Sequence, residues 1–257
     1  MSFPFTFELG GHTIYLHAIT EWLAIFAGFR YYLLLRRKQG DQITSETRIW
    51  IIIGAMFGAL AGSRLVGGLE NYPEMAASTQ KAFYFFSNKT IVGGLLGGLF
   101  GVEFTKAIAG EHKRSGDLFV FPIILALIIG RTGCFSMGLA EQTYGLRTGL
   151  PWGIDLGDGI PRHPVCLYEI FFLVLLWLSL SWLKAKQPPQ SGGLFRIFMI
   201  SYLIFRFMLD FIKPHFTWSA GLSTIQFACL AGLVWYIYDS LSTMKRAQQI
   251  KQTQPDA

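Results

Sequence analysis

The chain has 257 residues, of which 52% are hydrophobic, 16% aromatic and only 15% charged. Soluble domains carry about 25% charged residues, so this composition argues against a water-soluble fold. Twenty-two Lys and Arg against sixteen Asp and Glu give a net charge of +6, but the basic residues interrupt apolar runs instead of forming a stripe, which argues against nucleic-acid binding. The three cysteines are isolated and odd in number, so they predict neither a disulfide framework nor a CxxC metal site. No metal or cofactor is predicted.

Seven apolar stretches each have about the 20 residues that a helix needs to cross a hydrocarbon core roughly 30 Å thick. They lie at 13–35, 49–69, 90–108, 117–135, 164–183, 193–213 and 220–241. We therefore expect an all-α integral membrane protein, with a polytopic membrane domain at 1–244 and a polar, disordered cytoplasmic tail at 245–257. The first stretch is too long for a cleaved signal peptide and is followed by basic residues, as in a retained span.

The basic residues of the short loops predict the orientation, because positively charged loops stay in the cytoplasm. One alternating set of loops holds Arg36, Arg37, Lys38, Arg48, Lys106, Lys113, Arg114, Lys184, Lys186, Lys245, Arg246 and Lys251; the other holds Lys81, Lys89, Arg147, Arg162 and Lys213. The first set is predicted to be cytoplasmic, with the N-terminus outside and the C-terminus inside.

Two segments on the predicted outer side are longer than a turn. Residues 70–89 contain aromatic side chains that suit an interfacial anchor or a short helix lying on the membrane. Residues 136–163 are rich in Gly and polar residues and are expected to form a folded loop. Long loops of this kind are often functional.

Several charged residues fall inside the predicted spans, where an ionised group costs several kcal/mol unless it has a partner or a water-filled cavity. Arg64, Arg131 and Arg206 all lie in the outer half of their spans. Asp210 follows Arg206 by four residues, on the same helical face. Glu169 enters the same layer from the fifth span. We expect these charges to converge near the outer leaflet.

Two interpretations of these charges stay open. Arg206 with Asp210, and Arg64 or Arg131 with Glu169, could be ion pairs that hold helices together. Three guanidinium groups against two carboxylates nevertheless leave positive charge over, and planar bidentate donors suit the phosphate of an anionic phospholipid. The glycines of the second and third spans favour close helix packing, and a wall containing Gly93 and Gly94 could also leave room for acyl chains.

Six short motifs, in order, resemble those of the prolipoprotein diacylglyceryl transferase family of bacteria. They are Gly62-Ser63-Arg64-Leu65, Gly93-Gly94-Leu95-Leu96-Gly97, Gly130-Arg131-Thr132-Gly133-Cys134-Phe135 followed by Glu141 and Gly145, His163-Pro164 through Leu167-Tyr168-Glu169, Arg206-Phe207 with Asp210, and Ser223 to Gln226. The resemblance covers most of the chain, including its seven spans and their orientation.

The resemblance implies transfer of the diacylglyceryl group of phosphatidylglycerol to the lipobox cysteine thiol of a prolipoprotein, with release of glycerol-1-phosphate. It further implies an active site that opens to the periplasmic side. Such alkyl transfer needs a thiolate and fixed cations for the departing phosphate. We expect catalytic roles for Arg131, Arg206, Glu141, Glu169 and His163, and phospholipid binding by Arg64, Arg131, Arg206, Asp210, Tyr168, Gly93 and Gly94.

The chain departs from the family at residues that handle substrate and proton. Thr90-Ile91-Val92-Gly93 stands where many members have a His-Gly whose histidine is proposed as a base, and Cys134 stands at an asparagine of the signature. The base could be replaced by His163, Glu169, His17 or Glu21; His17 and Glu21 lie one helical turn apart on one face. Cys134 follows the arginine motif directly, but a free cysteine is more often buried and inert than nucleophilic.

These departures leave two alternatives to the family activity. The first is a related phospholipid-dependent transferase that uses another acceptor, such as a glycan, or transfers another group. The second is a non-catalytic membrane protein that binds or moves lipid and has kept the arginines.

Overall fold

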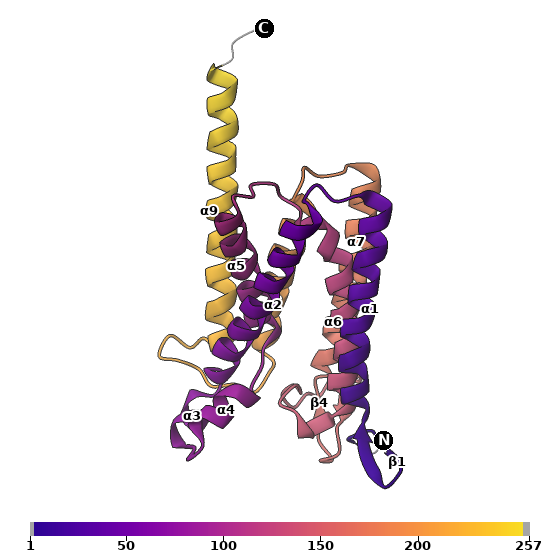
Figure 1. Cartoon of the computed structure of the whole chain (residues 1–257). Coiled ribbons are helices and arrows are strands. Elements are labelled where there is room, and N and C mark those ends of the chain that lie inside the picture. Colours follow the sequence, from indigo (N-terminus) through magenta and orange to yellow (C-terminus); the bar gives the residue numbers. More distant parts are fainter. Residues whose placement is uncertain (1–2, 254–257) are drawn as a thin grey trace. The chain divides into compact units, whose positions relative to one another are not determined.

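The computed structural model describes residues 3–253, and their side chains as far as residue 242. The chain divides into two compact units (Figure 1). The first unit comprises Met1–Ile51, Thr105–Phe198 and Met208–His215, and the second comprises Ile52–Phe104, Met199–Phe207 and Phe216–Ala257.

Each of the seven predicted spans contains a helix. The long helices are α1 (Leu16–Gln39), α2 (Ser45–Gly68), α5 (Ile91–Ala109), α6 (Val120–Ser136), α7 (Val165–Lys186), α8 (Gly193–Asp210) and α9 (Thr224–Thr253). Within the described residues, five helical segments are long and apolar enough to cross a membrane: α1, α2, α5, α7 and the segment Gly116–Ser136 that joins the 3₁₀ turn η1 (Gly116–Phe119) to α6. The helical membrane class is therefore supported, and the count of seven spans stays a prediction.

In the first unit, α1, α6 and α7 pack side by side (Figure 1). Small residues allow α1 to approach α6, since an ideal Cβ at Gly28 would lie 3.2 Å from both the Ala126 side chain and the Pro122 carbonyl oxygen. The Trp177 ring of α7 contacts two other rings of this unit, stacking on Tyr31 at 5.8 Å and meeting Phe121 at 5.2 Å. These contacts belong to the apolar core of the first unit.

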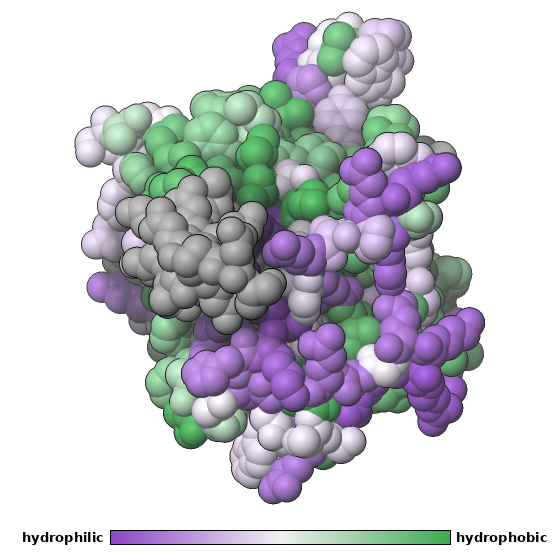
Figure 2. All heavy atoms as spheres, turned by 90° about the horizontal axis from the view of Figure 1, so that it is seen from above, coloured by the Kyte–Doolittle hydropathy of each residue, from purple (hydrophilic) through white to green (hydrophobic). Residues whose placement is uncertain are grey.

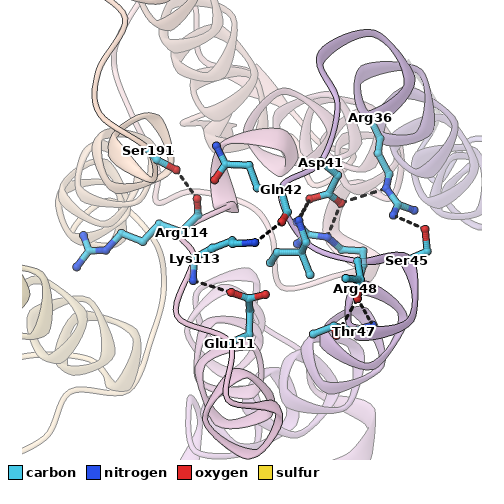
Figure 3. Close-up of polar contacts among 12 residues, drawn as sticks. Arg36, Asp41, Gln42, Ser45, Thr47, Arg48, Glu111, Lys113, Arg114 and Ser191 are labelled. Carbon is cyan, nitrogen blue, oxygen red and sulfur yellow. Dashed lines mark hydrogen bonds and ion pairs between the residues drawn. The ribbon is translucent and has the colours of Figure 1, made fainter.

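At one end of the first unit, the loops after α1, α5 and α7 meet. Lys113 Nζ donates to the Gln42 carbonyl oxygen at 2.9 Å, and Ser191 donates to the carbonyl oxygen of Arg114 (Figure 3). The Asp117 carboxylate accepts from the backbone amides of Gly192 and Phe195 at 2.8 and 2.9 Å, so a side chain from η1 caps the N-terminus of α8. Hydrophilic side chains gather on this face (Figure 2).

A buried arginine cluster anchors the loop between α1 and α2. Arg48, only 1% exposed, donates to both carboxylate oxygens of Asp41, at 2.7 and 2.5 Å. Arg36 Nε lies 3.1 Å from the same carboxylate and its Nη2 donates to Ser45 (Figure 3). Arg36 and Arg48, two of the basic residues that predict the orientation, therefore also hold this loop in place.

In the second unit, α2 and α5 pack through two rows of glycines spaced four residues apart. The rows are Gly54, Gly58 and Gly62 in α2, and Gly93, Gly97 and Gly101 in α5. An ideal Cβ at Gly97 would lie 2.2 Å from the Gly58 carbonyl oxygen, and one at Gly101 would lie 2.1 Å from that of Gly54. The predicted close packing of these spans is thus confirmed, and the two backbones touch where side chains are missing.

The N-terminal segment differs from the prediction. Residues 13–15, which were expected to begin the first span, belong to strand β2 (His12–Tyr15), which pairs antiparallel with β1 (Thr6–Leu9). The turn between the strands contains Gly10 and Gly11 at φ +59° and +79°, values that favour glycine and suit a tight hairpin. The prediction that the first span begins at residue 13 is therefore wrong, and the helix begins at Leu16.

The two long segments that are predicted to lie on the outer side are folded, as expected. Residues 70–89 contain the short helices α3 (Tyr72–Ala77) and α4 (Lys81–Ser87), with Phe83 and Phe86 exposed. Residues 136–163 contain the 3₁₀ turn η2 (Gly138–Ala140) and a small hairpin of β3 (Ile154–Asp155) and β4 (Pro161–Arg162).

The C-terminal helix is longer than predicted. It runs to Thr253, so residues 245–253 are helical where the sequence suggested disorder; residues 254–257 lie outside the described part. The division into a membrane domain at 1–244 and a cytoplasmic tail stays a prediction.

Candidate active site

An arginine and a glutamate from neighbouring helices of the first unit form a buried ion pair. Arg131 Nε of α6 lies 2.8 Å from Glu169 Oε2 of α7, and the two residues are only 8% and 1% exposed. Arg64 and Arg131 were both open as partners of Glu169, and the structure pairs Glu169 with Arg131. Because Nε is directed at the glutamate, the guanidinium plane has a fixed orientation.

Next to this pair lies a polar cluster that sequence spacing revealed only in part. Arg131 Nη1 donates to Cys134 Sγ at 3.7 Å. His17 Nε2 lies 3.1 Å from Glu141 Oε1 and 3.8 Å from Glu21 Oε2. The predicted juxtaposition of His17 and Glu21 is therefore present, and the structure adds Glu141 to it.

Close approach of α1 and α6 creates this cluster. An ideal Cβ at Gly133 would lie 2.0 Å from Thr20 Oγ1 and 3.1 Å from His17 Nδ1. A side chain at position 133 would therefore displace α1. The Gly-x-x-Gly spacing around Arg131 thus has a physical purpose, since Gly133 brings the helix that carries His17 against the helix that carries Cys134.

His163 and Tyr168 form a second polar group at the start of α7. The Tyr168 hydroxyl lies 3.2 Å from His163 Nδ1 and accepts a hydrogen bond from Trp152 Nε1 at 2.8 Å. Trp152 belongs to the folded segment 136–163, so this segment is tied to the helix that carries Glu169. No motif singled out Trp152, whose position became apparent only from the fold.

The rest of the segment 136–163 is held by local contacts. The Arg162 guanidinium hydrogen-bonds the Asp158 carboxylate at 3.0 Å and lowers its pKa below the usual value. Arg162 also lies over the Tyr144 ring, 5.2 Å from its centre. Gly145, a residue of the signature, packs so tightly that an ideal Cβ would lie 2.5 Å from the His163 carbonyl oxygen.

A small, partly open pocket lies between this segment and the ends of α6 and α7. Its lining includes Cys134, Thr143, His163 and Cys166 together with apolar side chains such as Phe135 and Leu156. Cys166 Sγ donates to the Thr143 carbonyl oxygen at 3.4 Å. The pocket thus joins the two polar groups of the first unit.

The remaining predicted residues lie mostly in the second unit. Arg64 donates to the Asn88 carbonyl oxygen at 3.4 Å, and Arg206 of α8 is 4% exposed. Asp210, fully buried, follows one turn later on α8 and belongs to the first unit, where His215 Nδ1 lies 3.8 Å from its carboxylate. The convergence of the three arginines stays a prediction.

The two glycines proposed to contact lipid differ in their surroundings. An ideal Cβ at Gly93 would lie 2.3 Å from the Gly62 carbonyl oxygen, whereas at Gly94 the nearest atom is 3.7 Å away. Gly93 is therefore required for helix contact, and Gly94 tolerates a methyl group. Phospholipid binding by either residue stays a prediction.

Ser223 and Gln226 are buried and bond reciprocally at the start of α9. The Ser223 amide donates to Gln226 Oε1 at 2.9 Å, and the Gln226 amide donates to Ser223 Oγ at 3.0 Å. This is a capping box, which begins the helix. Gln226 Nε2 also donates to the Phe207 carbonyl oxygen at 3.3 Å, so the motif ties α9 to the residue after Arg206.

Comparison with known proteins shows the family of the chain. The family model described as "Prolipoprotein diacylglyceryl transferase" matches residues 4–238. The chain belongs to this family. A relative from Bordetella bronchiseptica, named phosphatidylglycerol–prolipoprotein diacylglyceryl transferase, is 30% identical over 207 residues, which cover 73% of this chain and 76% of the relative. Relatives of the same name from Bordetella avium and Nitratidesulfovibrio vulgaris are 28% and 35% identical, with 82% and 68% of this chain covered and 81% and 68% of each relative.

Membership of the prolipoprotein diacylglyceryl transferase family confirms the resemblance found from the six motifs. The signature segment around Arg131 and the segment His163 to Glu169 meet in the first unit, where Arg131 and Glu169 pair. Val92 and Cys134, where the sequence is expected to depart from the family, belong to different units. Of these two, Cys134 lies within the polar cluster.

Proposed function

We propose that this protein transfers the diacylglyceryl group of phosphatidylglycerol to the lipobox cysteine of a prolipoprotein and releases glycerol-1-phosphate. Its family and the names of its relatives support this activity. In the reaction, the cysteine sulfur forms a bond to the glyceryl carbon that carried the phosphate ester, the bond from this carbon to oxygen breaks, and the thiol proton passes to a base.

The observation that carries the proposal is the fixed guanidinium of Arg131. Its Nε is directed at buried Glu169 and its Nη1 at Cys134, at the side where the pocket begins. A cation held in this way stabilises the negative charge that develops on a departing phosphate without reorganising during the reaction. Arg206 is proposed to act with it, with Asp210 one turn away to orient it, and Arg64 and Tyr168 are proposed to bind the phospholipid headgroup.

The proton acceptor is proposed to come from the polar groups of the first unit. His17 lies between Glu141 and Glu21, and His163 lies against Tyr168. A histidine beside a carboxylate is a common general base because the carboxylate orients the ring. Among the variants His17→Ala, His163→Ala and Glu21→Gln, the largest loss of rate identifies the group. Glu169→Gln also breaks the ion pair with Arg131, so a loss of rate in that variant alone does not identify Glu169 as the base.

The membrane setting is part of the proposal. We infer seven spans in the inner membrane, with the N-terminus and the active site on the periplasmic side. The five apolar segments and the basic loops that meet at one end of the first unit support this arrangement. The polar groups around Arg131 lie at the other ends of α6 and α7.

The test is incubation of the purified full-length protein with phosphatidylglycerol and a lipobox peptide, followed by mass spectrometry. A peptide whose cysteine carries a thioether-linked diacylglyceryl group supports the proposal. Release of glycerol-1-phosphate without this product contradicts the proposal and favours another acceptor. Cys134, which stands in place of the signature asparagine, also favours this alternative. Unchanged lipid contradicts it in favour of a lipid-binding protein.

A further inference from the structure

Three side chains of the first unit that are typical metal ligands lie together beside Arg131. His17 is in the first turn of α1, Cys134 is near the end of α6, and Glu141 directly follows η2. One ligand atom from each side chain lies within 4.8 Å of the other two, and all three residues are half-buried. Among the residues that the structure describes, no other His, Cys, Asp or Glu group has this geometry.

The chemistry of the three groups matches one metal. An imidazole nitrogen, a thiolate sulfur and a carboxylate oxygen are the ligands that Zn²⁺ uses in proteins. With bonds of about 2.0–2.3 Å to a tetrahedral ion, ligand atoms are about 3.3–3.8 Å apart, so the three side chains need only small rotations. One thiolate and one carboxylate also balance the two charges of the ion.

The surroundings hold the three ligands in place. Arg131 Nη1 donates to Cys134 Sγ at 3.7 Å, which fixes the position of the sulfur. The charge of Arg131 is in turn balanced by Glu169 at 2.8 Å. An ideal Cβ at Gly133 would lie 3.1 Å from His17 Nδ1. Packing against α6 therefore fixes the His17 ring with Nε2 toward Glu141. Outer contacts of this kind orient ligands in metal sites.

We propose that His17, Cys134 and Glu141 bind a Zn²⁺ ion and leave one coordination position open. Three protein ligands with an open position are the arrangement of catalytic zinc sites, whereas structural sites fill all four positions. Glu21, whose carboxylate is 3.8 Å from His17 Nε2 and half exposed, lies at the edge of the site as a candidate proton acceptor.

The use of the open position rests on the proposed function. The sulfur of the acceptor cysteine is a suitable fourth ligand, because zinc stabilises a thiolate. The thiol proton passes to Glu21 and then to solvent. The sulfur then forms its bond to the glyceryl carbon as the bond between carbon and phosphate oxygen breaks, and glycerol-1-phosphate leaves with the electron pair. Zinc at this site would compensate for the base that the chain lacks near Val92.

The experiment measures metal in the full-length protein without lipid or peptide. The purified chain is dialysed against a zinc buffer and its zinc is quantified by mass spectrometry; a cobalt-loaded sample is examined for thiolate-to-cobalt charge-transfer absorption. We expect one zinc per chain, lost in Cys134→Ser and His17→Ala and retained in the controls Cys229→Ser and His12→Ala. An unmodified chain without zinc, or a Cys134→Ser variant that retains as much as its control, overturns the proposal.

Two further readouts separate the metal site from the enzyme activity. Should Cys134→Ser fail to fold, the cobalt spectrum of the unmodified chain decides, since absence of the thiolate band overturns the site. A zinc-loaded chain that forms no thioether product supports the site and contradicts the proposed function. A chelator-stripped chain that transfers at the full rate overturns the role of zinc in the reaction and leaves the proposed function intact.

Discussion

Arg131 shows how one residue can serve both stability and chemistry. From sequence, the membrane arginines can be either ion-pair partners or phosphate ligands; in the structure, Arg131 forms a buried pair with Glu169. Removing one partner of a buried pair leaves an uncompensated charge. An alanine at position 131 would therefore confuse loss of folding with loss of activity.

A lysine at position 131 separates the two effects. We expect Arg131→Lys to keep the pair with Glu169 and its thermal stability, but to lower the rate of transfer roughly 100-fold, because one ammonium cannot replace an oriented, forked donor. Initial rates and thermal unfolding in detergent measure the two effects. The exposed Arg30 of α1 offers a control, since Arg30→Lys should change neither. Full activity of Arg131→Lys would contradict a phosphate-binding role.

Asp41 gives a prediction of pH dependence outside the membrane spans. Burial raises its pKa, but hydrogen bonds from Arg48 and the Ile43 amide lower it by more, so the pKa lies below its usual value of 3.8. A carboxyl group with a lowered pKa stabilises the fold above its ordinary pKa, and this contribution is lost as pH falls through the folded-state value. We expect Asp41→Ala to cost about 3–5 kcal/mol at neutral pH, because buried Arg48 loses its partner.

Thermal unfolding between about pH 6 and pH 3 measures this effect. The unmodified protein should lose stability toward the acid end, and Asp41→Ala should lose less, so the two curves should converge. Asp158→Asn, in the pair with Arg162, is the control and should change the curve much less, because water screens an ion pair at the surface. Parallel curves for Asp41→Ala and the unmodified chain would show that the network in Figure 3 does not carry this acid dependence.

At the scale of elements, the glycine rows of α2 and α5 make a matched pair of predictions. Gly97→Ala places a methyl carbon 2.2 Å from the Gly58 carbonyl oxygen, whereas Gly94→Ala meets nothing closer than 3.7 Å. We expect Gly97→Ala to destabilise the protein by about 1–3 kcal/mol through overpacking, and Gly94→Ala to have little effect. Detergent-denaturation midpoints compare the two variants, and equal midpoints would contradict the role of the rows.

The elements also show what local sequence predicts well. Each long apolar stretch contains a helix, because a span of apolar residues has few other ways to satisfy its backbone hydrogen bonds in a membrane. Helix starts were less predictable. Asp117 caps α8 from a distant part of the chain, and residues 13–15 continue a hairpin although they are mostly apolar. Such choices depend on partners that periodicity does not reveal.

At the scale of the whole molecule, the predicted topology can be tested directly. Green fluorescent protein is the cytoplasmic reporter and alkaline phosphatase the periplasmic one. Fusions after residue 244 and within 110–115 should be active only with green fluorescent protein. Insertions within 136–163 should be active only with alkaline phosphatase. The physical reason is the retention of basic loops in the cytoplasm. The opposite pattern at any of these positions would contradict the orientation proposed here.

The sequence by itself determined the membrane class, the positions of the long helices and the family, because these depend on apolar runs and on short motifs of adjacent residues. It also named Arg131, Glu169, His17 and Glu21 as candidates. Only the tertiary structure decided that Glu169 is the partner of Arg131, and that Cys134 and Glu141 lie beside His17. These groups are distant in the chain and meet because Gly133 lets α1 approach α6. Such contacts depend on the distance between two backbones, which no local pattern records.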